Sequence, residues 1–149
     1  MTRRVRAVTA DRGSVMLLTI GLSAVLLLLV AVVVDVSAVV LSKRALVNAA
    51  DGAAIAAAQQ PDREAISRSE TAHDERLPLD VDLVDEVVAT YASDAQSGQP
   101  GLVLQSSVDG GTVAVVDAYR TVRLPFSGWL GVLRVDLHAV GRAQSPTTP

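Results

Sequence analysis

Cysteine is absent from this sequence, and aromatic residues are rare. Without cysteine the chain has no disulfide framework, no zinc–cysteine site and no thiol nucleophile. Aromatic residues make up 3% of a chain that is 50% hydrophobic, so the apolar side chains are mainly Ala, Val and Leu. Much of this apolar content lies in one block, which leaves enough for only a small soluble core. The 149 residues therefore predict one modest domain.

Positive charge is scarce in the body of the chain. The first 12 residues contain four of the 13 bases and one of the 16 acids, which leaves 9 bases and 15 acids for the remainder. A nucleic-acid-binding domain clusters its basic residues on the folded part instead. We therefore expect no nucleic-acid partner.

Motifs that carry enzymatic chemistry are also missing. No glycine loop matches the phosphate-binding or dinucleotide-binding patterns. His73 and His138 belong to no motif that pairs a serine with an oriented base, so we expect both to be solvated. The acids of DVDLVDE at 80–86 lack the central glycine and the spacing of a calcium loop. We expect a protein that is not an enzyme, with no cofactor, no metal and no small-molecule substrate.

The longest apolar run extends from Val15 to Val34 without a charge. As a helix it spans about 30 Å, the thickness of the hydrocarbon core of a bilayer. The apolar region of a cleavable signal peptide is about 7–15 residues, and this run is longer. We therefore predict a retained signal anchor that spans a lipid bilayer. The alternative is a cleaved signal segment that releases a secreted soluble binding module.

Basic residues flank the run unequally. Four arginines precede it, whereas Lys43 and Arg44 follow it. By the positive-inside rule, residues 1–13 form a basic cytoplasmic tail and the C-terminal part faces away from the cytoplasm.

Asp35 is the first charged residue after the run. At the bilayer centre an aspartate costs about 2.5–3.5 kcal/mol, but the length of the run places Asp35 at its outer edge. Two interpretations stay open. Asp35 either marks the membrane boundary or is a carboxylate that pairs with a base or backbone donor of a neighbouring subunit.

The apolar helix is predicted to continue outward as a stalk, so that one helix covers residues 14–60. From Val36 to Gln59 the sequence has no proline and only one glycine, and it is rich in alanine. Pro61 then ends the helix. A stripe of small apolar residues recurs with helical spacing, and it serves either for close packing against another element or as a plain spacer. Its members are Leu46, Ala50, Ala53 and Ala57.

The remainder predicts a charged linker at 61–79, a small head at 80–143 and a disordered tail at 144–149. The apolar periodicity of the head predicts a helix over 82–95 that Asp82 caps. Strand-like runs follow at 102–108, 112–124 and 132–143, and Asp-Gly-Gly connects the first two. Between the last two, we expect Phe126, Trp129 and Leu130 to pack against the core. The predicted class is α+β: a transmembrane and stalk helix, a second helix and a three-stranded antiparallel sheet.

Residues 11–59 resemble the N-terminal module of TadE/TadG-like proteins of the Tad (Flp) pilus-assembly system. The most specific match is the Asn-Ala-Ala-Asp motif that opens the alanine tract. The matching motifs are Arg12-Gly13-Ser14, Val34-Asp35-Val36 and Asn48-Ala49-Ala50-Asp51.

The resemblance implies a pilin-like fold and a role as a minor pilin or pseudopilin-like component in the inner membrane of a bacterium. It implies other pilin-like subunits or pilus-assembly platform proteins as partners. A prepilin peptidase would cut between Gly13 and Ser14, but the fifth residue after that bond is Leu18 instead of the glutamate typical of type IV-like pilins. The candidate partner contacts are Asp35, Leu46, Asn48, Ala50, Asp51, Ala53 and Ala57.

Overall fold

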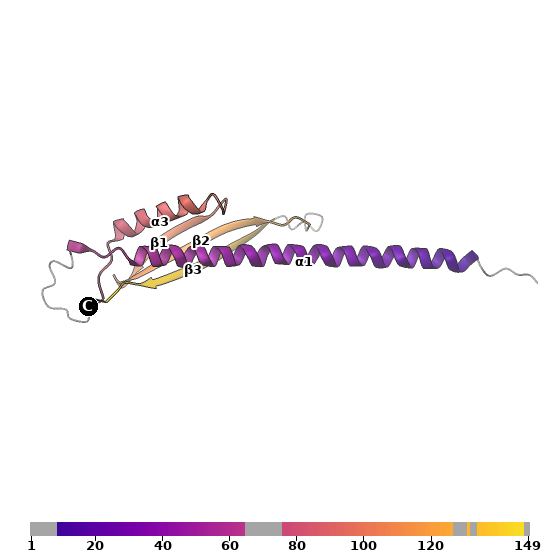
Figure 1. The fold of residues 1–149 in the computed structure, drawn as a ribbon, viewed down its shortest axis with the longest axis horizontal. Coiled ribbons are helices and arrows are strands. Elements are labelled where there is room, and N and C mark those ends of the chain that lie inside the picture. The colour runs from indigo at the N-terminus through magenta and orange to yellow at the C-terminus, as the bar shows by residue number, and fades with distance from the viewer. Residues whose placement is uncertain (1–8, 65–75, 127–130, 132–133, 148–149) are drawn as a thin grey trace, which may run out of the picture.

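The computed structural model describes residues 9–64, 76–126, 131 and 134–147. One very long helix extends well beyond a small head, in which a second helix and a sheet pack along its C-terminal half (Figure 1). This arrangement confirms the predicted α+β class. The elements are α1 (Thr9–Ala58), α3 (Val81–Ala95), β1 (Val103–Asp109), β2 (Val113–Arg123) and β3 (Arg134–Gln144).

Helix α1 is continuous through the apolar run and the alanine tract. It ends at Ala58, three residues before Pro61, as the ring of a proline requires. Its first residue is Thr9 and not residue 14, because residues 9–13 contain no proline and an apolar pattern marks only where the apolar part of a helix begins. The predicted tail at 1–13 therefore contributes its last residues to the helix.

Helix α3 begins one residue earlier than predicted, and its cap is Asp80 instead of Asp82. The Asp80 carboxylate accepts hydrogen bonds from the backbone N–H groups of Asp82 (3.0 Å) and Leu83 (3.2 Å). Asp82 lies in the first turn, where an acid complements the helix dipole. The buried side of the helix centres on Val84 and Val88.

The sheet is an antiparallel meander in the order β1-β2-β3, as predicted. Gly110 and Gly111 connect the first two strands with positive φ angles of 57° and 74°. Both central positions of a type I′ turn need this backbone conformation, which explains the Asp-Gly-Gly sequence. The inner face of the sheet packs against α1, and α3 contacts both α1 and β1.

The core of the head lies where the alanine stripe of α1 meets the sheet. Leu46, Ala50, Ala53 and Ala57 are fully buried. The backbones approach closely here, because a Cβ built on Gly141 of β3 would lie within 3.0 Å of backbone atoms of Ala50 and Asp51. Small side chains on the helix and glycine on the strand make this contact possible.

Both ends of the predicted linker and most of the predicted tail are bound to the head. Asp62 N–H donates to Pro78 O (2.8 Å) and joins the two ends of the linker, and Leu79 N–H donates to Gly111 O of the β1–β2 turn (2.8 Å), while residues 65–75 lie outside the described part. Ser145 N–H donates to Thr112 O (2.8 Å) and Leu77 N–H to Pro146 O (3.2 Å). Gln144 ends β3, and Thr147 forms an isolated bridge with Arg76, so residues 144–147 of the predicted tail contact the head.

Candidate functional site

The N-terminal half of α1 is exposed on every side. Between residues 14 and 34 the side chains are exposed except for one of intermediate burial. Among the described residues, one helix, α1, is long enough and apolar enough to cross a membrane. No residue of its most apolar stretch is buried. Because no protein surface covers these Leu and Val side chains, their exposure is compatible with a transmembrane anchor.

Asp35 lies at the point where the head first reaches α1. Its side chain is 5% exposed, and one carboxylate oxygen accepts a hydrogen bond from the backbone N–H of Phe126 at 3.0 Å. A backbone donor was one expected type of partner, and it comes from the β2–β3 connection of the same chain. The carboxylate therefore fixes this connection to the end of the apolar run.

Phe126 is exposed instead of packed against the core as predicted. Half of its side chain is accessible to solvent, because its backbone is held at Asp35, beyond the region where the sheet packs on α1. Trp129 and Leu130, which were expected to pack with it, lie outside the described residues. An exposed aromatic side chain therefore lies next to the end of the apolar run.

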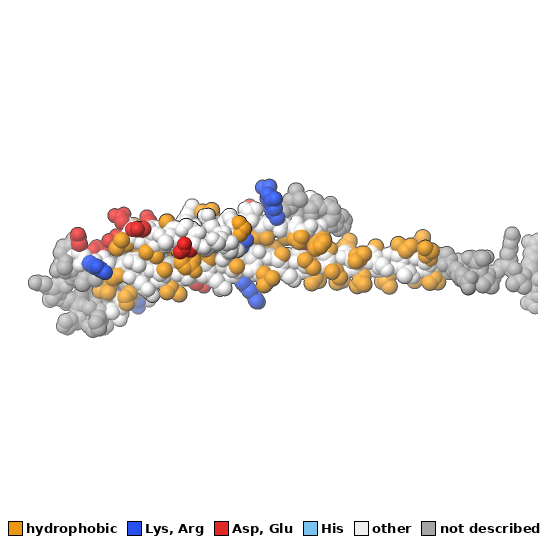
Figure 2. All heavy atoms as spheres, turned by 45° about the horizontal axis from the view of Figure 1, so that its top comes forward, with side chains coloured by type: hydrophobic (Ala, Val, Ile, Leu, Met, Phe, Trp, Pro, Cys, Tyr) orange, Lys and Arg blue, Asp and Glu red, His pale blue; other side chains and the backbone are white. Residues whose placement is uncertain are grey.

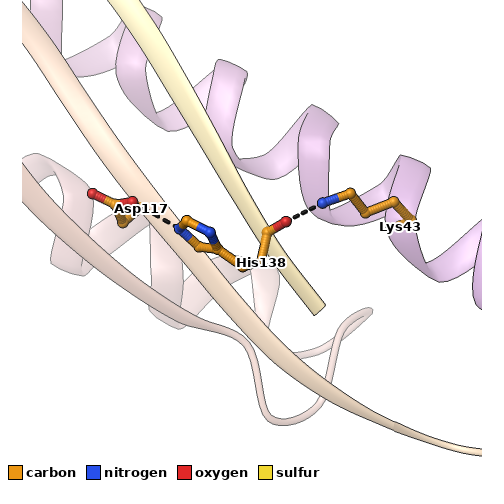
Figure 3. A network of polar contacts seen from close by, with 3 residues as sticks. All are labelled: Lys43, Asp117 and His138. Carbon is orange, nitrogen blue, oxygen red and sulfur yellow. Dashed lines mark hydrogen bonds and ion pairs between the residues drawn. The ribbon is translucent and has the colours of Figure 1, made fainter. Parts of the chain in front are cut away.

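Lys43 makes a second contact between α1 and the head. Its Nζ donates a hydrogen bond to the backbone carbonyl of His138 on β3 (Figure 3). The His138 ring points away to the outer face of the sheet, where Nε2 lies 2.8 Å from Asp117 Oδ1 and the ring stacks on Tyr119. His138 is thus a surface residue, as predicted, and His73 lies outside the described residues.

The Asn-Ala-Ala-Asp motif divides between two faces of α1. Ala49 and Ala50 are buried beneath the head at 4% and 0% exposure, whereas Asn48 and Asp51 are exposed. Residues three apart lie on the same helix face, which explains why the two polar residues flank the two alanines. The motif therefore has one side that binds its own head and one side that is free of the head.

The outward side of α1 forms a second stripe that sequence analysis did not identify as a unit. Its members have the same spacing as the alanine stripe and are all exposed. Ile55 lies on the same helix face as Asn48 and Asp51, and this apolar residue on a polar face is the sequence signal for the stripe. In the structure 55% of its side chain is exposed. We call this set the outward stripe: Arg44, Asn48, Asp51 and Ile55.

Metal or catalytic chemistry receives no support from the described part of the chain. There, no group of three or more His, Asp or Glu side chains is placed to hold a metal ion. One hollow of about 420 Å³ lies between the start of α3 and the segment after α1, and its lining includes Pro61, Asp62 and Leu79 but no histidine or serine. The candidate site is thus the pair of α1 surfaces, one apolar and one mixed.

Comparison with known proteins gives one result, which falls on this helix. No curated protein and no solved structure significantly matches the chain. Residues 13–60 match the model of Tad, the TadE/G-like Flp pilus-assembly family. The match covers the apolar run, Asp35 and the whole Asn-Ala-Ala-Asp motif, so it confirms that the segment forming most of α1 is similar to a TadE/G-like module.

Proposed function

We propose that the chain is a non-enzymatic, single-pass membrane component of a Tad/Flp-type pilus-assembly system, in the role of a minor pilin or pseudopilin. It acts by packing α1 against the helices of other pilin-like subunits or of assembly-platform proteins. Its head faces away from the cytoplasm of a bacterial cell, and residues 1–13 remain in the cytoplasm.

The continuity of α1 is the observation that carries this proposal. One helix joins an exposed apolar half to a half that is covered on one side by the head. Such a helix carries one contact surface inside the bilayer and another outside it on a single rigid rod. Their separation is fixed by the helical rise of about 1.5 Å per residue. A subunit that must be held in a membrane and then packed laterally with others needs both surfaces.

The outward stripe is the proposed contact surface outside the bilayer. The alanine stripe already packs against the chain's own sheet, so its role is to hold the head at a fixed position on α1. Asn48 and Asp51 remain exposed and provide hydrogen-bonding groups, while Ile55 adds apolar area. Polar side chains between helices set the register of packing more than they add affinity.

Co-purification from cells that express the whole pilus system tests this proposal. Asp51→Lys should reduce recovery of pilin-like or platform partners at least tenfold, the effect of about 1.4 kcal/mol. Asp94→Lys is the matched control, because it reverses an exposed acid on α3. Equal recovery of partners with both variants would rule out the outward stripe, and recovery of the wild-type chain alone would rule out a role in pilus assembly.

Amino-terminal sequencing of the mature protein separates the anchor from the secreted alternative. A chain that begins at Met1 or Ser14 retains the apolar run. A chain that begins after the run supports a cleaved signal segment, and it would have to keep the part of α1 from Leu46 to Ala58 that builds the core.

A further inference from the structure

Exposed basic side chains lie at both ends of the head. Figure 2 shows most of the acidic side chains over the end farthest from the exposed apolar part of α1 (residues 14–34, the bare helix), with a basic side chain among them, and further basic side chains where the bare helix begins. Four exposed bases lie toward the bare helix, on three different elements. They are Lys43 and Arg44 on α1, Arg123 on β2 and Arg134 on β3.

Two contacts fix the level of Arg123 and Arg134 along α1. The hydrogen bond from Lys43 to His138 aligns β3 with α1, and Arg134 lies four residues from His138 toward the bare helix, about 13 Å along the strand. Asp35 lies eight residues from Lys43 in the same direction, about 12 Å along the helix. Phe126 follows Arg123 by three residues in the same direction and bonds to Asp35, so the Arg123–Arg134 pair lies at most about 10 Å from Asp35 on the side of the head. The pair therefore lies just outside the end of the uncharged run.

Arg123 and Arg134 are directly opposite each other in the β2–β3 ladder, and both are exposed. Like charges in such a cross-strand pair destabilise a sheet. The nearest acid of β3, Asp136, accepts a hydrogen bond from Thr121 (2.6 Å). An anion held between the two guanidinium groups would attract both and offset their mutual repulsion. The planar guanidinium group also donates paired hydrogen bonds that match the geometry of a phosphate.

We propose that Arg123 and Arg134 bind the phosphate groups of anionic phospholipids at the surface of the bilayer that α1 crosses. The inference rests on the membrane anchoring proposed above. The headgroup layer extends about 5–8 Å beyond the hydrocarbon core, which is where the level of Asp35 places the pair. Phe126 presents a half-exposed apolar ring at the level of Asp35, closer to the bare helix than the arginine pair, where it suits the boundary with the acyl chains.

Lipid is favoured over an acidic protein as the partner because of this position. A lateral protein contact does not require the bases to lie at the end of the uncharged run, whereas a headgroup contact does. Lys43 is already engaged with the His138 carbonyl. Each exposed arginine near an anionic surface contributes about a fivefold preference, so the pair contributes roughly 25-fold.

Hydrogen exchange of the full chain in lipid nanodiscs tests the proposal. The exchange rates of the amides of residues 119–126 and 134–138 are compared in two kinds of disc. One contains phosphatidylcholine alone, and in the other part of the phosphatidylcholine is replaced by phosphatidylglycerol. We expect exchange in the anionic discs to slow by about tenfold or more. About 1 M salt, where the Debye length is about 3 Å, should remove most of this protection.

Paired variants separate the arginine pair from general charge. Arg123→Gln with Arg134→Gln should abolish the protection, and the same double variant in neutral detergent should melt at or above the temperature of the wild type because the repulsion is gone. Arg63→Gln with Arg142→Gln is the control, since both arginines are exposed and lie at the far end of the head. The control should retain the full protection.

Four results would overturn the proposal. Equal exchange in both kinds of disc shows that anionic lipid is not bound. Equal protection by inorganic phosphate in phosphatidylcholine discs shows binding of a free anion. Protection that depends on several copies per disc and not on phosphatidylglycerol shows contact between protein molecules. Failure of the chain to enter discs at all contradicts the membrane anchoring of the proposed function, which is distinguishable from the first three results.

Discussion

The contact between Gly141 and the backbone of α1 allows a sharp test of how the head is held. Gly141→Ala adds one methyl group within 3.0 Å of the Ala50 carbonyl group, and 2.7 Å from Asp51 N. Neither backbone can yield without moving a whole element. β3 must therefore shift away from α1. The shift would loosen the packing around Ala50 and Ala139, which are both buried.

The expected cost follows from that shift. A gap of 0.5–1 Å forfeits a quarter to a half of the dispersion attraction between the facing atoms, and overpacking of this kind costs about 1–3 kcal/mol. Because the obstacle is backbone, we expect about 3 kcal/mol for Gly141→Ala. For a folded unit of about 100 residues, such as the head with the part of α1 that it covers, that lowers the midpoint of thermal unfolding by about 12–24 °C.

Gly52→Ala is the matched comparison. A Cβ on Gly52 would meet the tip of the Tyr91 ring, with Tyr91 Cζ at 3.1 Å, and a ring tip on α3 can move. Alanine also stabilises a helix interior by about 0.5–1 kcal/mol relative to glycine. The two effects oppose each other, so the net change should stay within about 1 kcal/mol.

Thermal unfolding of both full-length variants in the same detergent, followed by circular dichroism, provides the measurement. We expect a large loss of stability for Gly141→Ala and little change for Gly52→Ala. Equal midpoints for Gly141→Ala and the wild type, or an equal loss in both variants, would refute the claim that direct backbone contact holds β3 on α1.

Two further predictions concern carboxylates that bind backbone N–H groups. Asp35→Ala removes the acceptor of Phe126 N–H and should cost about 1–3 kcal/mol, whereas Asp35→Asn retains an acceptor and should cost less; hydrogen exchange at the Phe126 amide checks both. Asp80→Ala should destabilise the head by about 1 kcal/mol through loss of the N-cap, and Asp82→Ala by only a few tenths, as measured by chemical denaturation. A larger effect at Asp82 than at Asp80 would contradict the capping assignment.

The elements were predictable because their signals are local. The uncharged run from 15 to 34, the alanine tract, Pro61 and the Asp-Gly-Gly turn each act through nearby backbone, so the long helix, its C-terminal end and the hairpin follow from the sequence. The capping residue was misplaced because Asp80 and Asp82 are chemically equivalent, and only the φ and ψ angles at the helix start separate them.

The site was only half predictable because its contacts are distant in sequence. The alanine stripe predicted a packing surface, but not that the chain's own sheet covers it. Asp35 and Phe126 are separated by 91 residues, and no periodicity in either segment indicates their bond. The polar residues of Asn-Ala-Ala-Asp became interpretable only when Ala49 and Ala50 were found buried. Besides the small residues of the alanine stripe, Gly141 within β3 is a sequence sign of the close backbone approach.

Site-specific photo-crosslinking in cells that assemble the pilus tests the central claim most directly. A photoreactive residue is placed at Asn48 or Ile55 on the outward stripe, and at Ala53 on the buried stripe. The account predicts adducts with other pilin-like or platform subunits from the two outward positions, and adducts only within the chain from Ala53. Partner adducts from Ala53 together with none from Asn48 or Ile55 would contradict it.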